Sequence, residues 1–541
     1  MSRYLQRNQS RCEDEFVPGT VYILNEDHIS GTAYTSKDII LRPTPSSDPE
    51  DPLRWPRWRK LLLVFFLVCY SSVLGAVSNW DGTIYASLLV EYKTTVFKLN
   101  LGAAFMILML GIGNIFFTPL ADVMGRRFVY ITSSLIVMLA NMWLALSNNI
   151  IDSILAKTLL GFGAAPFEAL PVISISDTFF AHERGTMMGA YVFGLAFGSF
   201  IGPICAGYMA VAHGWRMVYW LGVCISGAVA LMIVIFMEET IFHRPEDLSE
   251  DNVAACHNPK LFEDDRPSSN DKSDKIPEPA QDVEEGVGEV FDVRKFRLFS
   301  PLWKLSPCSP GVFIERLWRP LTVCTFPAVI WGGINYGTCV SWLSVLATTE
   351  SLIFSAPPYG FSPSTLGLFF ISPMIGSLIG AYFAGPLNDW LSLYLSSRNN
   401  NTREPEYRLW AFVPAAIIMP GGLVIYGVTA AHGLEWIVPV VGMGMVGFGL
   451  SVGGSVTMAY IVDCYKDLAG EVVTTIILIR NIVGFALTFA IQPWIDRSGL
   501  QNTFITIGCL SFAITIFAVF FIVMGKSIRL WTKDRYLNFK K

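Results

Sequence analysis

Long apolar runs are the feature that most constrains this chain. Runs of roughly 20 apolar residues, enough to cross a hydrocarbon core of about 30 Å, occur twelve times in the sequence. They centre near Phe66, Leu108, Leu135, Gly163, Phe197, Val229, Gly332, Gly376, Ile417, Gly447, Ala486 and Phe517. With 52% hydrophobic and 15% charged residues, the chain is too apolar for a soluble globule. We therefore predict an all-α membrane protein with twelve transmembrane helices.

A hydrophilic insert of residues 240–319 divides these runs into two sets of six. The insert is acidic between Asp264 and Glu285 and ends in Asp292–Lys304, which predicts either a helix lying on the inner leaflet or plain linker. The expected domains are an N-terminal tail (1–59), a six-helix bundle (60–239), a central loop (240–319), a second six-helix bundle (320–525) and a C-terminal tail (526–541).

The distribution of Lys and Arg predicts the orientation. Basic residues collect in the first tail and in the loops and flank around Arg126, Arg184, Arg408 and Lys526. The positive-inside rule then places both termini in the cytoplasm, with residues 1–51 as a mobile tail. Without a removable signal peptide, the first span must direct insertion. We expect a multi-pass protein of the cell membrane, with the vacuolar membrane as the alternative.

Several classes of function are disfavoured by composition. The net charge of −5 comes mainly from acids in one loop, so no nucleic-acid partner is implied. The 10 cysteines are scattered without a Cys-x-x-Cys pair, so we expect neither disulfides nor a metal site. There is no Walker motif and no nucleophile-base arrangement, so we expect no enzyme, no cofactor and no use of ATP.

One short polar hinge stands out, at Gly113–Arg127, between the second and third runs. Asp122 ends the incoming helix and Arg126 and Arg127 start the outgoing one, each where the helix dipole disfavours its sign. Gly125 permits the tight reversal. These charges are therefore placed for a purpose other than helix stability. We expect Asp122 to pair with Arg126 or with a base on a neighbouring helix, as part of an inner gate.

The string resembles the signature loop of the major facilitator superfamily, Gly-x4-6-(Pro)-Leu-Ala-Asp-x-x-Gly-Arg-Arg. An ordinary positive loop is the alternative interpretation. Asp51–Lys60 also resembles the segment before the first span in fungal drug:proton antiporters. The resemblance implies two six-helix bundles that rock around a central site. Gly385–Asp389 is a weaker copy of the hinge without Gly-Arg-Arg, so we expect the role of Arg126 to be performed once.

The fourth span contains two charges, Lys157 and Glu168, which are expensive at membrane depth. Eleven residues apart, they differ by about 20° around a helix and share a face with small residues such as Gly161. That stripe predicts either close helix packing or the wall of a cavity. The charges themselves predict a function or a structural charge pair. In the family, an arginine at the Lys157 position is associated with proton transfer.

Two further segments resemble parts of fungal antiporters. The loop after the fourth span contains Asp177, Glu183 and Arg184, which in such transporters bridge helices at the inner gate; a solvated loop is the alternative. The fifth span resembles the antiporter motif Gly-x3-Gly-Pro-x2-Gly-Gly, with Ala206 replacing one glycine; helix packing alone is the alternative. The residues that carry this structural motif are Gly198, Gly202, Pro203 and Gly207.

Polar side chains in the later spans predict a substrate site, because such groups face a cavity or another helix. The candidates are Asn335, Tyr336 and Trp342 in the seventh span, Ser455 in the tenth and Arg480 in the eleventh. Trp342 has the alternative of an interfacial anchor. Arg480 is expected to pair with a carboxylate on a facing helix that the sequence does not identify.

We predict a monomeric transporter whose partners are the bilayer, a small organic substrate and protons. Burial favours the neutral form of a carboxylate, so Glu168 is the predicted proton carrier, with Lys157 and Asp81 assisting. Export of a xenobiotic or secondary metabolite is favoured. The alternatives are uptake of an organic cation such as a polyamine, with Glu168 and Asp81 as counter-charges, a non-transporting sensor on the same fold, and a membrane enzyme.

Overall fold

The computed structural model describes residues 17–22, 51–241, 310–399 and 402–540, and this part of the chain is nearly all helical. The first half forms η2 (Pro52–Arg54), α2 (Arg57–Asn79), α3 (Asp81–Tyr92), α4 (Val96–Met124), α5 (Arg126–Leu146), α6 (Ile150–Ala164), α7 (Pro166–Thr178), α8 (Ala181–His213) and α9 (Trp215–Phe236).

The second half begins with α11 (Pro310–Val323) and continues through α12 (Pro327–Phe354), α13 (Pro363–Phe369), α14 (Ile371–Tyr382), η6 (Phe383–Leu387), α15 (Asn388–Arg398), η7 (Pro405–Ala411), α16 (Phe412–Ala431), α17 (Ile437–Cys464), η8 (Lys466–Leu468), α18 (Ala469–Ile516), α19 (Ala518–Trp531) and α20 (Lys533–Lys540). Two short strands, β1 (Val21–Tyr22) and β2 (Thr402–Arg403), pair antiparallel.

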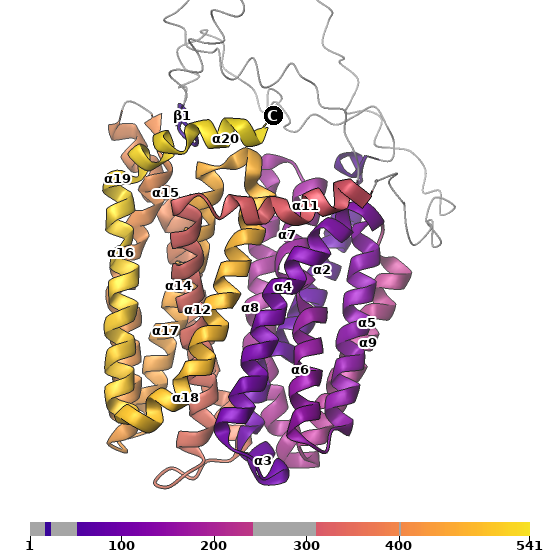
Figure 1. The fold of residues 1–541 in the computed structure, drawn as a ribbon, viewed down its shortest axis with the longest axis vertical. Coiled ribbons are helices and arrows are strands. Elements are labelled where there is room, and N and C mark those ends of the chain that lie inside the picture. The colour runs from indigo at the N-terminus through magenta and orange to yellow at the C-terminus, as the bar shows by residue number, and fades with distance from the viewer. Residues whose placement is uncertain (1–16, 23–50, 242–309, 400–401, 541) are drawn as a thin grey trace, which may run out of the picture.

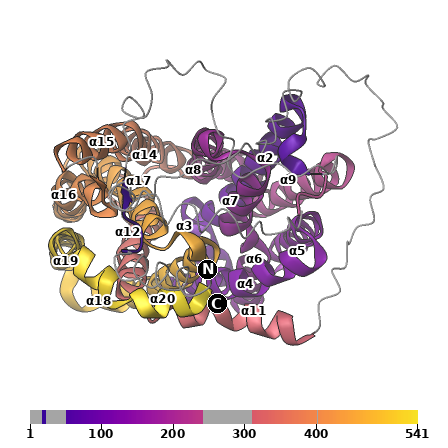
Figure 2. The same ribbon diagram turned by 90° about the horizontal axis from the view of Figure 1, so that it is seen from above.

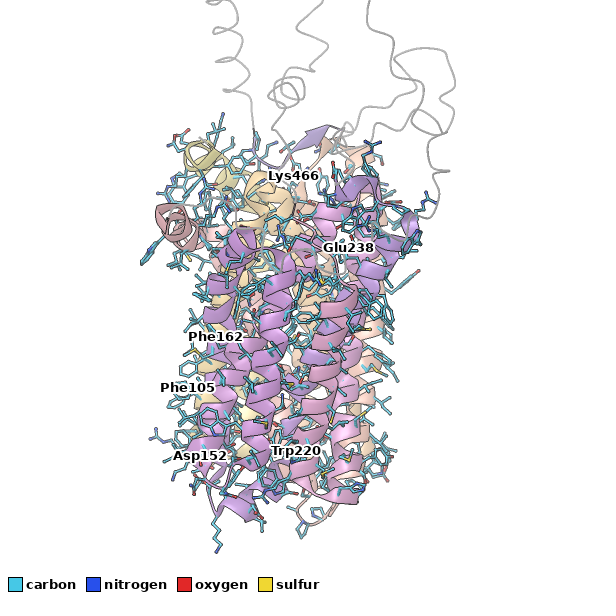
Figure 3. The ribbon with its side chains drawn as sticks, turned by 90° about the vertical axis from the view of Figure 1, so that its right-hand side faces the viewer. Phe105, Asp152, Phe162, Trp220, Glu238 and Lys466 are labelled. Atoms are coloured by element: carbon cyan, nitrogen blue, oxygen red, sulfur yellow. The ribbon has the colours of Figure 1, made fainter. Side chains whose placement is uncertain are left out.

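The helices form two bundles that lie side by side (Figure 1). We call the end that carries β1, α11 and α20 the tail end, and the opposite end, where α3 lies, the far end. Figure 2 looks onto the tail end, where α11 runs along one side next to α4 and α18. Charged side chains such as Glu238 and Lys466 lie toward the tail end, while Phe105 and Phe162 lie in the middle of the bundle (Figure 3).

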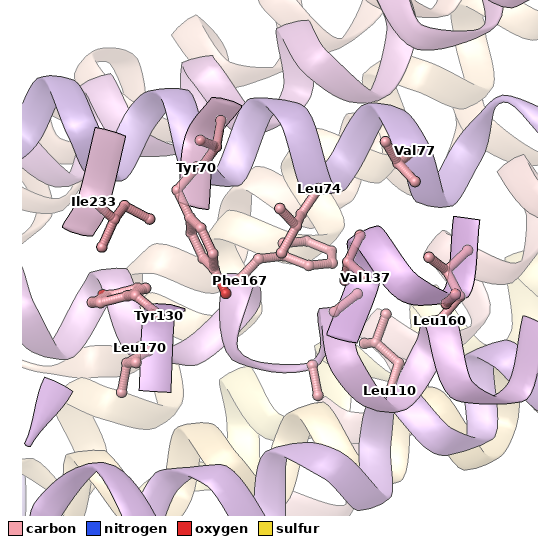
Figure 4. Close-up of a cluster of buried hydrophobic side chains, with 14 of the residues drawn as sticks. Tyr70, Leu74, Val77, Leu110, Tyr130, Val137, Leu160, Phe167, Leu170 and Ile233 are labelled. Carbon is pink, nitrogen blue, oxygen red and sulfur yellow. The ribbon is translucent and has the colours of Figure 1, made fainter. Parts of the chain in front are cut away.

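Large apolar side chains cover the outside of the bundles and also fill their cores. That arrangement suits helices packed within lipid, because hydrocarbon outside replaces water. Figure 4 shows part of the first core, which α2, α4, α5, α6, α7 and α9 build from Tyr70, Leu74, Val77, Leu110, Tyr130, Val137, Leu160, Phe167, Leu170 and Ile233.

Eleven helices in the described residues are long and apolar enough to span a membrane, one fewer than the predicted twelve. The difference lies in the last of them, Ala469–Trp531, which has 63 residues. At 1.5 Å per residue it would measure about 95 Å, three times the thickness of a hydrocarbon core. The chain reverses within it at Gly499, whose φ of 76° lies outside helical geometry.

The ends of the predicted domains differ from the helix ends. α2 begins at Arg57, three residues before the expected bundle, because Pro56 sets its start. The expected central loop ends inside α11, and the described part of the expected C-terminal tail covers the last turns of α19 and all of α20. The proposed surface helix at Asp292–Lys304 and the acidic part of the loop lie outside the described residues.

α11 joins the two bundles at the tail end. Arg316 lies 3.6 Å from Asp122 at the end of α4, and Arg319 lies 3.7 Å from Glu471 at the start of α18. Thr475 of α18 also donates a hydrogen bond to the carbonyl of Pro320. The last part of the central loop is thus a helix that contacts both halves.

Part of the N-terminal tail is docked, whereas the sequence predicted a mobile tail. The guanidinium of Arg529 on α19 donates to the carbonyl oxygen of Pro18 and, at 3.0 Å, to the Thr20 hydroxyl. Gly19, with φ of 81°, packs on the backbone at the end of α17, at Asp463. Hydrophilic composition did not reveal this docking, because it depends on a buried base from the opposite end of the chain.

Candidate functional site

An ion pair between Glu168 of α7 and Arg480 of α18 connects the two bundles. Their side chains are only 12% and 7% exposed. Pro166 begins α7 and leaves Glu168 in the first turn, where the helix dipole stabilises a carboxylate. The carboxylate partner of Arg480 that the sequence did not identify is therefore Glu168.

The surroundings of this pair add an aromatic ring and amide groups. The ring of Tyr336 lies 5.1 Å from the Arg480 guanidinium carbon, and Asn481 Oδ1 accepts a hydrogen bond from Arg480 at 3.1 Å. The Tyr191 hydroxyl donates to the Glu168 carbonyl at 3.1 Å, which ties α8 to α7. We call Glu168, Arg480, Tyr336 and Asn481 the central cluster.

The central cluster lies deep between the helix ends. Glu168 precedes the tail end of its span, Thr178, by ten residues, and Arg480 follows the start of α18, Ala469, by eleven. At 1.5 Å per residue both lie about 15 Å from the tail end of their helices. This is about half the thickness of a hydrocarbon core.

A second buried ion pair lies within the first bundle. Lys157 Nζ is 2.8 Å from Asp81 Oδ2, and the Tyr219 hydroxyl donates to Asp81 Oδ1 at 2.8 Å. The Tyr85 ring lies 5.3 Å from the same ammonium group. The Lys157 side chain is 1% exposed, so the pair is almost completely removed from solvent.

The two charges of the fourth span thus pair with different helices. The sequence placed Lys157 and Glu168 on one face of a continuous helix. α6 ends at Ala164 and α7 begins at Pro166, but Ala165 between them keeps the helical dihedrals φ −42° and ψ −43°. The two charges lie about 16 Å apart along the helix axis, so each meets a different neighbouring helix. The small residues nearby serve close packing, because a Cβ at Gly161 would lie 2.1 Å from the Met106 carbonyl oxygen.

The hinge at the tail end has the geometry that its sequence predicts. Arg126 lies 2.9 Å from Asp177 and 3.6 Å from Asp122, so it joins the ends of α4 and α7. Gly125 has φ of 98°. Glu239, which the sequence did not single out, accepts hydrogen bonds from the backbone N–H of Arg126 at 2.9 Å.

The remaining gate candidates anchor neighbouring backbone. The Arg127 side chain donates to the Val234 carbonyl at 2.6 Å, and its backbone N–H donates to Glu239 at 3.2 Å. Arg184 donates to the Phe179 carbonyl at 2.9 Å. Glu183 interacts electrostatically with Lys60 of α2.

The second half contains a matching arrangement of charges, although its copy of the hinge lacks Gly-Arg-Arg. Arg408 lies 3.4 Å from Asp389 at the start of α15 and 2.9 Å from Asp463 at the end of α17. One arginine therefore joins two acids in each half. We call Asp122–Arg126–Asp177 the first triad and Asp389–Arg408–Asp463 the second.

The sequence missed the second triad because its arginine is not adjacent to the hinge. Arg126 follows Asp122 by four residues, whereas Arg408 follows Asp389 by nineteen, across a loop. The available signals were Asp389 at the end of the eighth span, Asp463 at the end of the tenth span, and Arg408 in the loop after the eighth span. The pairing of these three residues required the tertiary structure.

The glycines of the fifth span allow close contact with two partners. A Cβ at Gly198 would lie 2.1 Å from the Ser72 carbonyl oxygen, and one at Gly202 would lie 2.7 Å from Ala76, both on α2. A Cβ at Gly207 would lie 2.4 Å from the carbonyl oxygen of Pro363, in the other bundle. Pro203 lies within α8 at the same contact, opposite Gly367.

Among the described residues, the other substrate candidates, Asn335, Trp342 and Ser455, make no hydrogen bond, ion pair or ring contact with the side chains of the central cluster. The Asn335 amide donates to Thr457 at 3.1 Å, and Trp342, 1% exposed, packs in a hydrophobic core. Such burial removes Trp342 from the membrane interface. Ser455 is exposed. Of the predicted substrate residues, Tyr336 and Arg480 are therefore the two that lie together with Glu168.

The family model for the major facilitator superfamily matches residues 61–488. The chain belongs to the major facilitator superfamily. This transporter is 31% identical to the uncharacterized MFS-type transporter C1271.10c of Schizosaccharomyces pombe, over 97% of this chain and 94% of that protein. It is 28% identical to HOL1 of Saccharomyces cerevisiae, over 99% of each.

A solved structure with a similar fold is the human organic anion transporter MFSD10 (TETRAN), with a TM-score of 0.52 and 15% identity. The match covers 86% of this chain and 100% of the MFSD10 chain. At this identity the likeness concerns the fold alone. The transporter is thus a multi-pass membrane protein with the major facilitator fold, which confirms the predicted fold class.

Proposed function

We propose that the protein is a proton-coupled exporter of a small organic molecule, a xenobiotic or a secondary metabolite, of the drug:proton antiporter type. Two six-helix bundles would rock around the central cluster, with Ala469–Trp531 forming two of twelve spans that meet near Gly499. The observation that carries the proposal is the buried Glu168–Arg480 pair, because it joins the bundles and can be broken by one proton.

Protonation of Glu168 removes its negative charge and with it the attraction to Arg480. An ion pair in a medium of low dielectric constant is strong while both charges are present, and losing one leaves the other uncompensated. Arg480 would then turn toward a new partner, such as substrate held against the Tyr336 ring. Binding of a proton to Glu168 would in this way free Arg480 to contact the substrate within the central cluster.

The Asp81–Lys157 pair gives the first bundle a second place where a proton can act. Asp81 begins α3, which packs against α12 of the other bundle at the far end. Loss of the negative charge on Asp81 would leave Lys157 buried without a counter-charge. We assign this pair an assisting role in coupling, through the position of α3.

The two triads supply gates at the tail end. Each arginine holds the ends of two helices of its own half, and α11 adds Arg316 beside Asp122. Rocking of the halves would rearrange these contacts as a two-state element. The glycine ridge of α8, at Gly198 and Gly207, would provide the close surface on which the halves turn.

Export of a neutral or weakly charged molecule agrees better with these pairs than uptake of an organic cation. The cation alternative needs Glu168 and Asp81 as free counter-charges, and each is already paired with a base. A cation would first have to displace Arg480 or Lys157. A non-transporting sensor on the same fold is separated from a transporter by the flux experiment below.

We further propose a monomer in the cell membrane with both termini in the cytoplasm, the vacuolar membrane being the alternative. The support is the excess of Lys and Arg at the tail end, where Arg126, Arg316 and Arg408 all lie in triads or beside them. The tail end would then face the cytoplasm and the far end the opposite side.

The test is Glu168→Gln in reconstituted vesicles, with and without an imposed pH gradient. The glutamine has the shape of the protonated acid, so substrate binding is expected to remain while gradient-driven accumulation falls at least about tenfold, which corresponds to about 1.4 kcal/mol. The control is Glu91→Gln, which removes an exposed ion pair with Arg216. Unchanged gradient-driven accumulation in Glu168→Gln would assign Glu168 a structural role.

A further inference from the structure

Glu350 is a buried carboxylate that the proposed coupling leaves unused. It lies near the far-end terminus of α12, and the residue is 1% exposed. Within the described part of the chain, neither Oε1 nor Oε2 has a hydrogen-bond partner. The sequence analysis did not single it out, because one acid near the end of an apolar run gives no sign of its burial.

The environment of Glu350 is apolar. Leu346 and Phe354, one helical turn to either side on the same face, are both 0% exposed members of a hydrophobic core. Burying an ionised carboxylate without a partner in such a place costs far more free energy than burying the neutral acid. The structure therefore holds Glu350 in an arrangement that suits the protonated acid.

The titratable groups on neighbouring elements leave Glu350 without a counter-charge. On α16, the Tyr426 hydroxyl interacts electrostatically with Glu350 and is hydrogen-bonded to Thr349. On α3, each ionisable group has another neighbour: Asp81 and Tyr85 lie beside Lys157, Glu91 pairs with Arg216, and the Tyr92 hydroxyl is hydrogen-bonded to Ser147. α17 and α18 also pack against α12. The charged side chains at the far-end part of α18, Asp496 and Arg497, are exposed, and the one charged residue of α17, Asp463, lies at its tail end. The sequence of α13 has no ionisable side chain, and Tyr359 in the loop before it donates to the Leu434 carbonyl.

The two bundles meet on the same turn of α12. A Cβ at Gly82 of α3 would lie 2.7 Å from the Ala347 carbonyl oxygen, so the two backbones are in close contact. The backbone N–H of Ala86 donates to the Ser351 hydroxyl at 3.3 Å. Ala347 and Ser351 flank Glu350 in the sequence, and this far-end contact is what closes α12 against α3.

We propose that Glu350 is a further proton-binding site, located in the second bundle, and that α12 closes against α3 only when this carboxylate carries a proton. The inference rests on the proposed proton-coupled transport and adds a site to it. When α3 and α12 separate, water reaches Glu350 and its proton can leave. When they close, a proton from the far-side water must bind one carboxylate oxygen, because an unpaired charge would otherwise be buried.

The experiment measures the far-end distance directly. Spin labels at Val90→Cys on α3 and Ala356→Cys after α12, both exposed positions, report the separation by pulsed electron resonance in purified full-length protein whose native cysteines are replaced. The wild-type background is expected to shift from a short to a long distance as the pH rises. Glu350→Gln is expected to keep the short distance at every pH, and Glu350→Asp to retain the shift.

The matched control is Glu435→Gln, the same chemical change at an exposed far-end position, which should behave as wild type. A pH-dependent shift in Glu350→Gln equal to that of wild type, or a wild type without any shift, would overturn the proposal. If Glu350→Gln does not fold, infrared difference spectroscopy replaces it: a protonated-carboxyl band that is lost on raising the pH in wild type and displaced in Glu350→Asp supports the assignment, and a wild type without that band contradicts it.

These readouts need neither substrate nor a gradient, so they are separate from the test of transport. A wild-type protein that shifts with pH but shows no gradient-driven flux would contradict the proposed function and leave the assignment of Glu350 standing. Gradient-driven flux, together with a far-end distance whose pH dependence is the same in Glu350→Gln as in wild type, would support the proposed function and contradict the assignment of Glu350.

Discussion

Gly125 is required by its backbone conformation and by its neighbour. Its φ of 98° lies in the region that side chains with a Cβ rarely adopt. An added Cβ would also lie 2.4 Å from Glu239 Oε2, the carboxylate that accepts hydrogen bonds from the first N–H groups of α5. One residue thus places Arg126 for the first triad and leaves room for its cap.

Gly125→Ala is expected to lower the melting temperature of the purified transporter and weaken the hinge. A side chain with a Cβ in the backbone conformation of Gly125, φ 98° and ψ 151°, costs about 1–3 kcal/mol, and displacement of Glu239 adds to this cost. Thermal unfolding followed by fluorescence in detergent measures the loss. Gly189→Ala is the matched control, because a Cβ there meets nothing within 4 Å; an equal change in both variants would refute this account of Gly125.

At the scale of the helices, the two triads perform the same task with different connections. In the first, acids at the ends of α4 and α7 meet an arginine at the start of α5. In the second, acids on α15 and α17 meet an arginine in η7. Each triad cross-links the second, third and fourth spans of its half at the tail end.

Arg408→Gln should therefore impair transport in the same way as Arg126→Gln, at an unchanged amount in the membrane. We expect at least about a tenfold loss of rate, equivalent to about 1.4 kcal/mol, and a larger one at Arg126, whose side chain is 7% exposed against 18% for Arg408. Flux assays with surface quantification measure this. Arg398→Gln, which removes an arginine stacked on exposed Tyr394, is the control; wild-type flux in Arg408→Gln would leave only the first triad as a gate.

Across the whole molecule, the two ends of the chain meet at the second bundle. Arg529, 1% exposed, makes two hydrogen bonds of 2.8 Å to Glu406 and also donates to the N-terminal segment at Pro18 and Thr20. β1 then pairs with β2 beside it. One buried guanidinium consequently ties α19, η7 and the N-terminal segment together.

Arg529→Ala is expected to destabilise the second bundle and free residues 17–22. Removing one partner of a buried pair costs about 3–5 kcal/mol, because Glu406 is left without its base. Limited proteolysis with mass mapping, and the melting temperature, measure the two effects. Lys526→Ala on the same helix removes a 54% exposed partner of Glu404 and should cost less than about 1 kcal/mol; protection of residues 17–22 in Arg529→Ala would contradict the assignment.

The sequence by itself determined what depends on neighbours along the chain. Apolar runs predicted the membrane spans, because crossing hydrocarbon sets their length, and the Asp122–Arg127 hinge predicted its own turn and ion pair. Glu168 was identified as a charge too costly to be accidental, and Arg480 as a base that pairs with a carboxylate on a facing helix. Both partners of the central ion pair were thus among the predicted site residues, Glu168 as the proton carrier and Arg480 as a substrate-binding residue.

The tertiary structure decided which charges meet. Glu168 and Arg480 are 312 residues apart, the second triad crosses a loop, and Glu350 lies buried on the part of α12 that contacts α3 and α16. The two charges of the fourth span meet different helices, Lys157 meeting Asp81 of α3 and Glu168 meeting Arg480 of α18. Helical periodicity states which face a residue occupies, but only packing brings a partner to that face, because Coulomb attraction and burial act through distance in space.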